Sequence, residues 1–210
     1  MIRVLVADDH AIVREGLKQI VADTPDIVVA GEAKNGQEAL DSVSKTAYDV
    51  VLLDISMPDR SGLDILNQLK SQRPELRILI LSIYPEEQYA VRALRAGASG
   101  YLTKESAPDE LIAAIRKVSS GGNYISHSLG ERLANRLRFD ASKPPHETLS
   151  DREFQIMRMI ASGKRVKEIA EELLLSVKTV STYRRRVLDK MGVKNNSALT
   201  RYAIQNRLLE

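Results

Sequence analysis

The stretch Ile2-Arg3-Val4-Leu5-Val6-Ala7-Asp8-Asp9 joins a short apolar run directly to a pair of acidic residues. An apolar run without polar alternation is typical of a strand that is buried on both faces of a sheet. Similar runs recur at residues 27–30, 50–53, 78–81 and, more weakly, 100–102. The first part of the chain therefore contains five expected strands.

Helical patterns lie between these strands. Ile12, Leu17, Ile20 and Val21, for example, have the spacing of an amphipathic helix. Strands that alternate with helices predict a parallel sheet with helices on both faces. Five such units are too few for a closed eight-stranded barrel, and they fit the doubly wound fold with strand order 2-1-3-4-5. We expect residues 1–120 to form this α/β domain.

The chain changes character after the fifth expected unit. Leucines with helical spacing run from Leu129 to Leu137, and the segment from Phe139 to Thr148 is nearly free of apolar residues. We therefore expect a connecting helix and a linker over residues 121–148. Residues 149–210 have helical apolar spacing throughout, which predicts an all-α domain of four helices.

The composition excludes several kinds of site. The 210 residues include no cysteine and 3 histidines, so disulfides and thiolate metal sites are excluded and a histidine zinc site is not expected. No apolar run approaches the roughly 20 residues that cross a bilayer, and the N-terminus lacks the pattern of a secretory signal. We therefore expect a cytoplasmic protein without a membrane partner.

Acidic residues follow two of the expected strands. Asp8 and Asp9 come directly after the first strand, and Asp54 comes directly after the third. In the order 2-1-3-4-5 these strands are neighbours at the point where open α/β sheets bind ligands, so the three carboxylates should converge. Clustered carboxylates repel one another, and an all-oxygen set favours Mg²⁺. The sequence therefore predicts a magnesium site.

Ser82 ends the fourth expected strand and Lys104 follows the fifth, on the same rim of the sheet. Each residue alone has an ordinary interpretation: an Asp caps the next helix, a Lys is solvated, and a Ser bonds locally. Together they place a hydroxyl and an ammonium beside a metal-bound carboxylate. This combination suits a phosphoryl group carried on Asp54.

Residues 1–120 resemble the receiver domain of two-component response regulators. The motifs that carry the resemblance are Asp8-Asp9, Asp54 in Leu53-Asp54-Ile55-Ser56-Met57-Pro58, Gly62, Ser82, and Lys104 in Gly100-Tyr101-Leu102-Thr103-Lys104. The resemblance implies that Asp54 accepts a phosphoryl group from a histidine kinase. The protein is then an acceptor in phosphotransfer that can catalyse its own dephosphorylation, and it is not otherwise an enzyme.

The same resemblance assigns roles to the other residues of the site. It implies that Asp9, Asp54 and the backbone carbonyl of Ser56 bind Mg²⁺, with Asp8 assisting. Lys104 would pair with the phosphoryl oxygens, Ser82 would move towards them, and Tyr101 would change its rotamer as a switch. From spacing alone, a packed aromatic residue with a wet hydroxyl is the better interpretation of Tyr101, and its role as a switch rests on the resemblance.

Positive charge is concentrated in the last part of the chain. Residues 1–120 carry 14 Lys and Arg against 18 Asp and Glu, whereas residues 121–210 carry 17 against 10. A helix over 166–174, a short turn and a second helix over 177–190 form the layout in which the second helix reads the major groove of DNA. A helical bundle with a solvated basic face is the ordinary alternative.

The second helix separates apolar from polar positions. Val180, Val187, Leu188 and Met191 mark its buried face. Lys178, Ser181, Thr182, Arg185 and Asp189 then lie on the outward face, where donors can reach base edges. The residues expected nearer the flanks, where they would contact phosphates, are Lys178, Thr179, Tyr183, Arg184, Arg186 and Lys194.

Residues 149–210 resemble the LuxR-type helix-turn-helix, through Leu149-Ser150-x-Arg152-Glu153, Gly163, Glu168-Ile169-Ala170, Ser176-x-Lys178-Thr179-Val180 and Lys190-Met191-Gly192-Val193. Both resemblances together cover nearly the whole chain as a transcription regulator of the NarL/FixJ class. Tyr183 stands where this family commonly has histidine, which leaves the operator sequence open.

The resemblance also implies partners. These are a sensor histidine kinase, double-stranded DNA and a second copy of the chain, with RNA polymerase as a further partner. The last helix, over residues 197–208, would dimerise on a roughly palindromic site through Ala198, Thr200, Arg201 and Ile204. The apolar spacing fits equally a helix that only closes the domain core.

Three other functions fit parts of the sequence. A Mg²⁺-dependent aspartyl phosphatase would carry a second acid where Ser56 stands, together with a cap insertion. A flavodoxin-like nucleotide binder would not place Asp8-Asp9-His10 where phosphate is held. Both leave the basic C-terminal domain unexplained. A DNA binder that works without phosphorylation is the third alternative, and the complete acidic site argues against it.

Overall fold

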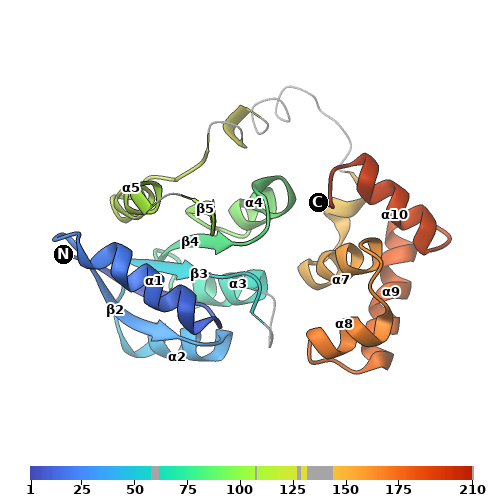
Figure 1. Cartoon of the computed structure of the whole chain (residues 1–210), viewed down its shortest axis with the longest axis horizontal. Coiled ribbons are helices and arrows are strands. Elements are labelled where there is room, and N and C mark those ends of the chain that lie inside the picture. The colour runs from blue at the N-terminus through green and yellow to red at the C-terminus, as the bar shows by residue number, and fades with distance from the viewer. Residues whose placement is uncertain (58–61, 107, 127–128, 132–143, 210) are drawn as a thin grey trace. The chain divides into compact units, whose positions relative to one another are not determined.

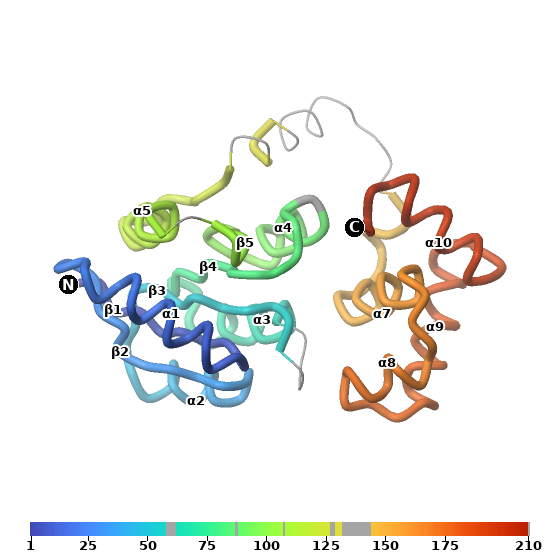
Figure 2. The backbone as a smooth tube through the Cα atoms, in the orientation of Figure 1, coloured from blue at the N-terminus to red at the C-terminus, as the bar shows by residue number. Residues whose placement is uncertain are grey.

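The chain folds into two compact units, Met1–Ala134 and Asn135–Glu210, in a computed structural model that describes residues 1–57, 62–106, 108–126, 129–131 and 144–209. The N-terminal unit combines a sheet with helices, and the C-terminal unit is helical (Figures 1 and 2). No helix among the described residues is both long enough and apolar enough to cross a membrane.

The N-terminal unit alternates strands with helices, as expected from its apolar runs. Its strands are β1 (Ile2–Ala7), β2 (Ile27–Ala33), β3 (Val50–Leu53), β4 (Arg77–Ser82) and β5 (Gly100–Thr103). Its helices are α1 (Ala11–Ala22), α2 (Gly36–Lys45), α3 (Gly62–Gln72), α4 (Glu86–Arg95) and α5 (Pro108–Ser119). All neighbouring strands are parallel, and the sheet order β2-β1-β3-β4-β5 confirms the prediction.

Alternate side chains of each strand point to opposite faces of the sheet. Val4 and Val6 of β1 belong to a core formed with Leu17 and Val21 of α1 and with apolar residues of α5. The helices α2, α3 and α4 cover the other face (Figure 1). Because both faces are covered, the central strands β1, β3 and β4 are almost continuously apolar.

The strand register brings the polar residues to one edge of the sheet. Ala7 pairs with Leu53, so the residues after β1 and β3 leave the sheet at the same level. The backbone N–H of Asp54 donates to the carbonyl of Ala7 over 2.9 Å. On the other side, the backbone N–H of Lys104 donates to the carbonyl of Ser82 over 2.7 Å.

Two features of this unit differ from the expectations. Strand β2 continues to Ala33, three residues past its apolar run, because an edge strand can carry the polar Glu32 on a partly solvated side. Ile12, which we expected on the apolar face of α1, is 83% exposed. Arg14 takes a place on the buried face of this helix together with Leu17.

The C-terminal unit contains the four expected helices and a short 3-10 helix. Its elements are η1 (Pro145–Thr148), α7 (Asp151–Ala161), α8 (Val166–Glu172), α9 (Val177–Met191) and α10 (Asn196–Gln205). The predicted capping box of Ser150 and Glu153 is confirmed at the start of α7. Gly192 ends α9 in the left-handed region with a φ of 65°. Helix α8 ends two residues before the expected Leu174, which has a φ of 52°.

Part of the expected linker has regular structure. Residues 145–148 form η1, in which His146 is buried and its Nδ1 lies 2.8 Å from the hydroxyl oxygen of Tyr202 on α10. The end of the linker segment therefore packs on the helical unit. Of the leucine series, Leu129 is buried, whereas Leu133 and Leu137 lie outside the described residues.

Candidate functional site

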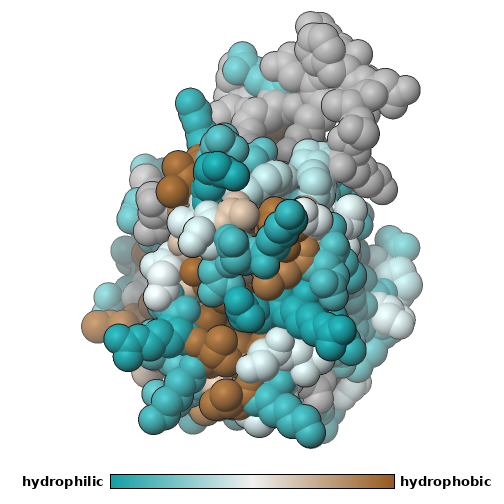
Figure 3. All heavy atoms as spheres, turned by 90° about the vertical axis from the view of Figure 1, so that its right-hand side faces the viewer, coloured by the Kyte–Doolittle hydropathy of each residue, from teal (hydrophilic) through white to brown (hydrophobic). Residues whose placement is uncertain are grey.

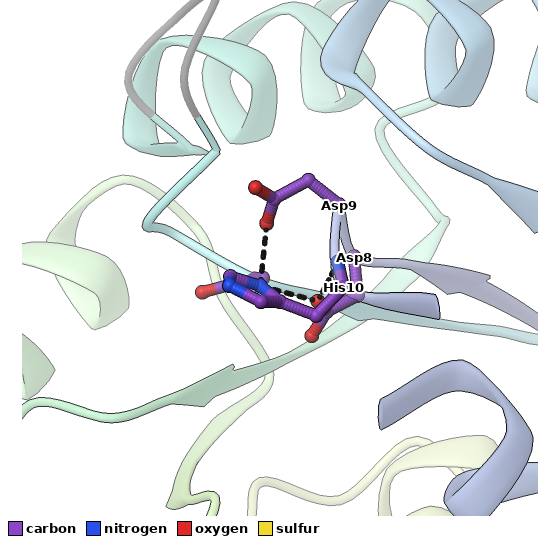
Figure 4. A group of neighbouring side chains, drawn as sticks. Asp8, Asp9 and His10 are labelled. Carbon is purple, nitrogen blue, oxygen red and sulfur yellow. Dashed lines mark hydrogen bonds and ion pairs between the residues drawn. The ribbon is translucent and has the colours of Figure 1, made fainter. Parts of the chain in front are cut away.

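An acidic pocket lies at the ends of β1 and β3. Asp8 and Asp54 are 2% and 1% exposed, and Asp9 is partly buried beside them. Together with His10 they place one ligand atom each within 4.8 Å of all the others. Figure 4 shows Asp8, Asp9 and His10 of this group. The structure thus brings together the carboxylates that the sequence predicted to converge.

Local hydrogen bonds orient the two buried carboxylates. Oδ1 of Asp8 accepts the backbone N–H of His10 over 2.8 Å, and Oδ1 of Asp54 accepts the backbone N–H of Ser56 over 2.8 Å. Each carboxylate therefore folds over the backbone at the point where its strand ends. The second oxygen of each side chain stays available for a partner across the pocket.

Lys104 supplies that partner. Its Nζ lies 2.6 Å from Oδ2 of Asp8 and 2.7 Å from Oδ2 of Asp54, and its side chain is 12% exposed. Burial raises the pKa of Asp54 above its usual range, and attraction and hydrogen bonding to Lys104 offset this in part. Burial also opposes the charge of Lys104, but the attraction and hydrogen bonds of Asp54 and Asp8 together outweigh it and raise the Lys104 pKa.

The donor set of the pocket fits a hard divalent cation. Three carboxylates and one ammonium leave a net charge of −2 when His10 is neutral. Carboxylate oxygens are the ligands that Mg²⁺ prefers, and the clustered negative charge is relieved when a cation binds.

His10 is a member of the pocket that we did not predict. Its Nδ1 lies 2.9 Å from Oδ1 of Asp9 and 3.4 Å from Oδ1 of Asp8 (Figure 4). The side chain is 60% exposed, so it covers the rim of the pocket. Its position directly after the acidic pair was the available signal.

Gly62 lets helix α3 begin against the pocket loop. A Cβ at this position would lie 2.3 Å from Cα of Ile55 and 2.6 Å from the carbonyl oxygen of Asp54. The N–H of Gly62 donates to the carbonyl of Ile55 over 3.2 Å. The motif glycine therefore permits a close backbone approach directly after Asp54.

A chain of hydrogen bonds leads away from the pocket. The buried Ser82 hydroxyl accepts the backbone N–H of Tyr84 over 3.1 Å. The hydroxyl of Tyr101 donates to the carbonyl of Tyr84 over 2.7 Å. Tyr101 is fully buried and its hydroxyl has a protein partner, so the expectation of a wet hydroxyl is wrong. Tyr84 connects the two predicted site residues.

Helix α9 separates its residues as the sequence predicted. Val180, Val187 and Met191 are buried, and Leu188, the fourth residue predicted on this face, is partly buried. The exposed residues of the predicted DNA set are Lys178, Ser181, Thr182, Arg185, Arg186 and Lys194, and the partly buried ones are Thr179, Tyr183 and Arg184. The view onto the C-terminal unit in Figure 3 shows mostly hydrophilic side chains, with apolar side chains in separate patches.

Several of the predicted DNA-binding side chains have partners within the unit. Nε of Arg184 donates to Oδ1 of Asn196 over 2.8 Å. The hydroxyl of Thr179 lies 2.8 Å from that of Ser176, which caps α9 by accepting the Thr179 N–H. Arg185 lies 3.9 Å from Asp189 in an exposed pair. Sequence spacing did not reveal these contacts.

Helix α10 serves the core with one face and leaves the other exposed. Leu199 and Ala203 are buried, whereas Arg201 is exposed and Ile204 is 62% exposed. The buried residues fit a helix that closes the domain core, and the exposed residues fit an interaction surface, so both interpretations of this helix remain compatible with the structure.

Comparison with known proteins identifies both units. Residues 4–116 match the family described as the response regulator receiver domain, and residues 147–203 match bacterial regulatory proteins of the luxR family. The response regulator UvrY of Escherichia coli is 39% identical over 209 residues, which are 99% of this chain and 96% of UvrY. The response regulator GacA of Pseudomonas protegens is 37% identical over 210 residues, covering 100% and 99% of the two chains.

Solved structures agree with these relatives. RcsB of Salmonella typhimurium matches with a TM-score of 0.70 and 27% identity over 98% of both chains. RcsB of Salmonella enterica serovar Typhimurium bound to the promoter rprA in the presence of a phosphomimetic matches with a TM-score of 0.64 and 27% identity, over 96% of this chain and 98% of that one. This chain therefore belongs to the two-component response regulators of the NarL/FixJ class, in which a receiver domain is joined to a LuxR-type helix-turn-helix DNA-binding domain.

Proposed function

We propose that Asp54 accepts a phosphoryl group from a partner sensor histidine kinase and that this event controls DNA binding by the C-terminal unit. The observation that carries the proposal is the setting of Asp54. Its carboxylate is buried at the end of β3, between the Lys104 ammonium at 2.7 Å and the Ser56 N–H at 2.8 Å. A buried carboxylate with fixed donors beside it is arranged for chemistry more than for solvation.

The reaction is a transfer between two side chains. An oxygen of the Asp54 carboxylate forms a bond to phosphorus while the bond from phosphorus to the imidazole nitrogen of the kinase phosphohistidine breaks. The electron pair stays on that nitrogen, which then takes up a proton. Lys104, which contacts Asp54 through Oδ2, is placed to turn to the new phosphoryl oxygens.

Asp8, Asp9, Asp54 and the backbone carbonyl of Ser56 would hold the Mg²⁺ ion. When bound, Mg²⁺ neutralises the negative charge that gathers on the transferred phosphoryl oxygens. The three carboxylates lie close enough together to share one ion. Removal of the phosphoryl group by water at the same site would return the protein to its unmodified state.

The hydrogen bonds of Tyr84 suggest how the signal leaves the pocket. If the Ser82 hydroxyl turns to donate to a phosphoryl oxygen, its bond from the Tyr84 N–H is strained or lost. The same residue holds the Tyr101 hydroxyl through its carbonyl. A rotamer change of Tyr101 would then shift the β4–α4 loop, which contains Tyr84, towards a second conformation.

The C-terminal unit would read DNA with helix α9. We propose Lys178, Ser181, Thr182 and Arg185 for contacts with base edges. Phosphate contacts would come from Lys178, Thr179, Tyr183, Arg184, Arg186 and Lys194. In domain terms, residues 1–120 form the phosphoacceptor domain, residues 121–148 the connection, and residues 149–210 the DNA-binding domain.

The protein would act as a homodimer in the cytoplasm. The exposed face of α10, with Arg201 and Ile204, is the surface we assign to dimerisation on DNA, together with Ala198 and Thr200. Related solved structures include two RcsB dimers bound to two parallel DNAs. A two-fold dimer calls for a roughly palindromic site. RNA polymerase would be the partner that reads out the bound regulator.

Phosphorylation of Asp54 can be tested directly. Wild-type protein and Asp54→Asn are incubated with Mg²⁺ and acetyl phosphate, and intact-mass spectrometry detects the addition of one phosphoryl group. We expect the addition in the wild type only, with peptide mapping to the segment that contains Asp54. Equal modification of Asp54→Asn, or none in the wild type, would contradict the proposal.

A further inference from the structure

Arg14 is a buried charged residue that the proposed reaction does not use. It lies in the first turn of α1 with a side chain that is 8% exposed, on the face that also buries Leu17 and Val21. A guanidinium is rarely buried unless it is paired, because the loss of its hydration must be compensated. Its partners therefore indicate what it does.

The guanidinium connects three segments. Its Nη1 donates to the backbone carbonyl of Asp8 over 2.8 Å, and its Nε donates to Oε2 of Glu32 on β2 over 3.1 Å. The other oxygen of Glu32 accepts a hydrogen bond from Lys18 of α1 over 2.8 Å. Arg14 thus ties α1 and the edge strand β2 to the loop that carries the acidic pair.

The carbonyl of Asp8 belongs to the peptide bond between Asp8 and Asp9. Because this peptide is planar, fixing its carbonyl oxygen also fixes the direction in which the backbone of Asp9 leaves. The neighbouring groups are held too, since the Asp8 N–H donates to the Ala33 carbonyl over 3.1 Å and the His10 N–H donates to Asp8 Oδ1 over 2.8 Å. Of these three hydrogen bonds around the Asp8–Asp9 peptide, only the one from Arg14 comes from a side chain of α1.

Glu32 keeps Arg14 in place and balances its charge. Hydrogen bonds from Lys18 and then from Arg14 lower the pKa of Glu32, against the effect of burial, so it is ionised at neutral pH. The guanidinium consequently adds little net positive charge beside the acidic pocket. Its contribution is geometric, through a charge-assisted hydrogen bond to a backbone oxygen.

We propose that Arg14 is a positioning residue for the acidic pocket: it holds the Asp8–Asp9 peptide in the orientation that Mg²⁺ binding requires, and Glu32 fixes Arg14 for this task. The inference rests on the proposed magnesium site. It concerns residues outside that site, which act on the ligands through the backbone.

Whether replacing Arg14 weakens or tightens Mg²⁺ binding distinguishes a positioning role from a purely electrostatic one. Arg14→Gln removes a positive charge near the carboxylates, so an electrostatic effect alone would tighten Mg²⁺ binding. Loss of positioning would weaken it. We expect the dissociation constant for Mg²⁺ to rise about tenfold in Arg14→Gln. Arg14→Lys keeps the charge but has a single nitrogen to donate to both the Asp8 carbonyl and Glu32. Its dissociation constant for Mg²⁺ should therefore lie between those of Arg14→Gln and the wild type.

The matched control is Arg116, which makes a two-fold hydrogen bond with Asp26 but is exposed. This pair joins α5 to the residue before β2, at the amino ends of the strands, whereas the pocket lies at their carboxyl ends. Arg116→Gln therefore breaks an arginine–carboxylate pair of the same chemistry without touching the acidic loop. Its dissociation constant for Mg²⁺ should equal that of the wild type.

The experiment measures Mg²⁺ binding to the full-length variants by isothermal titration calorimetry, beside thermal melting in the absence of Mg²⁺. In parallel, the rate of phosphorylation by acetyl phosphate is followed against Mg²⁺ concentration. In Arg14→Gln the half-saturating concentration should rise while the rate at saturating Mg²⁺ stays close to that of the wild type. Glu32→Gln, which keeps the guanidinium but removes its anchor, should shift Mg²⁺ binding in the same direction.

Equal or tighter Mg²⁺ binding by Arg14→Gln, with only a lower melting temperature, would overturn the inference and leave the magnesium site intact. Should Arg14→Gln fail to fold, Arg14→Lys decides, because it keeps the charge: a dissociation constant for Mg²⁺ equal to that of the wild type overturns the inference. Wild-type protein that binds no Mg²⁺ would instead refute the proposed function, and this inference with it.

Discussion

The acidic pocket depends on single residues whose positions follow from the ends of the strands. Asp8, Asp9 and Asp54 could be predicted as a cluster because the order of parallel strands decides which strand ends are neighbours. For His10 the sequence offered only its position directly after the acidic pair, which it contacts in the structure. Arg14 could not be predicted, because its role depends on side-chain directions across α1 and β2 that the apolar pattern does not encode.

Replacing Lys104 should change how phosphorylation depends on pH. Lys104→Met removes the ammonium whose attraction lowers the Asp54 pKa, so that pKa rises further above its usual range. Because the ionised carboxylate is the nucleophile, the rate with acetyl phosphate should decline at a higher pH than in the wild type as the solution is acidified. At neutral pH we expect a loss of roughly 100-fold, since the charge that faces the phosphoryl oxygens is gone.

The comparison for this variant is Lys45→Met, which removes an exposed lysine from the end of α2. Its pH profile should coincide with that of the wild type. A Lys104→Met profile that also coincides with the wild type would show that Lys104 neither lowers the Asp54 pKa nor assists the transfer.

Arg185 should decide sequence preference more than overall affinity. Its side chain is exposed on α9, where a guanidinium can bind a guanine edge with two hydrogen bonds. Arg185→Ala should lose about 1 to 3 kcal/mol of discrimination at one base pair, measured as the ratio of affinities for matched and substituted duplexes. Arg186→Ala should weaken binding to all duplexes alike. A uniform loss for Arg185→Ala as well would remove Arg185 from the base-reading set.

Among whole elements, the helices of the C-terminal unit were the most predictable. The Ser150 capping box and the stop at Gly192 have local sequence signatures, and both are present. The extension of β2 and the packing of η1 were missed, because an edge strand and a short 3-10 helix carry little apolar periodicity. Such elements are formed by their tertiary partners.

Glu153 should contribute stability that depends on pH. Its side chain is 4% exposed and pairs with Lys190 at 2.6 Å. Burial would raise its pKa, but the hydrogen bonds from Lys190 and Ser150 lower it below the ordinary 4.5. Because the Glu153 pKa is lower in the folded than in the unfolded protein, the charged side chain stabilises the fold at pH values above the pKa of the unfolded state. This stabilisation is lost as the pH falls through the lower pKa of the folded state.

Glu153→Gln should therefore lower the free energy of unfolding by about 1 kcal/mol at neutral pH, as the loss of a helix cap usually does. The difference from the wild type should shrink as the pH falls below about 4.5. Urea denaturation followed by circular dichroism over a pH series measures this. Glu168→Gln, in the exposed capping-box arrangement of α8, is the control with a smaller effect. A constant difference at every pH would rule out a role for the Glu153 charge.

For the whole molecule, the alternation of strands and helices and the charge asymmetry sufficed to predict an α/β unit followed by a basic helical unit. The two matching families and the solved relatives support the same architecture. The coupling between the units has no sequence signature, because it depends on which conformations the phosphoryl group on Asp54 stabilises. It is the central claim of the proposed function.

The most direct test measures DNA affinity by fluorescence anisotropy, with a labelled duplex that phosphorylated wild-type protein has selected from a random-sequence library. Wild-type protein and Asp54→Asn are each titrated with and without Mg²⁺ and acetyl phosphate. The account predicts that the phosphodonor tightens binding and promotes dimerisation of the wild type, at least severalfold, and leaves Asp54→Asn unchanged. Equal affinity of the wild type in both conditions, with phosphorylation verified by mass spectrometry, would contradict it.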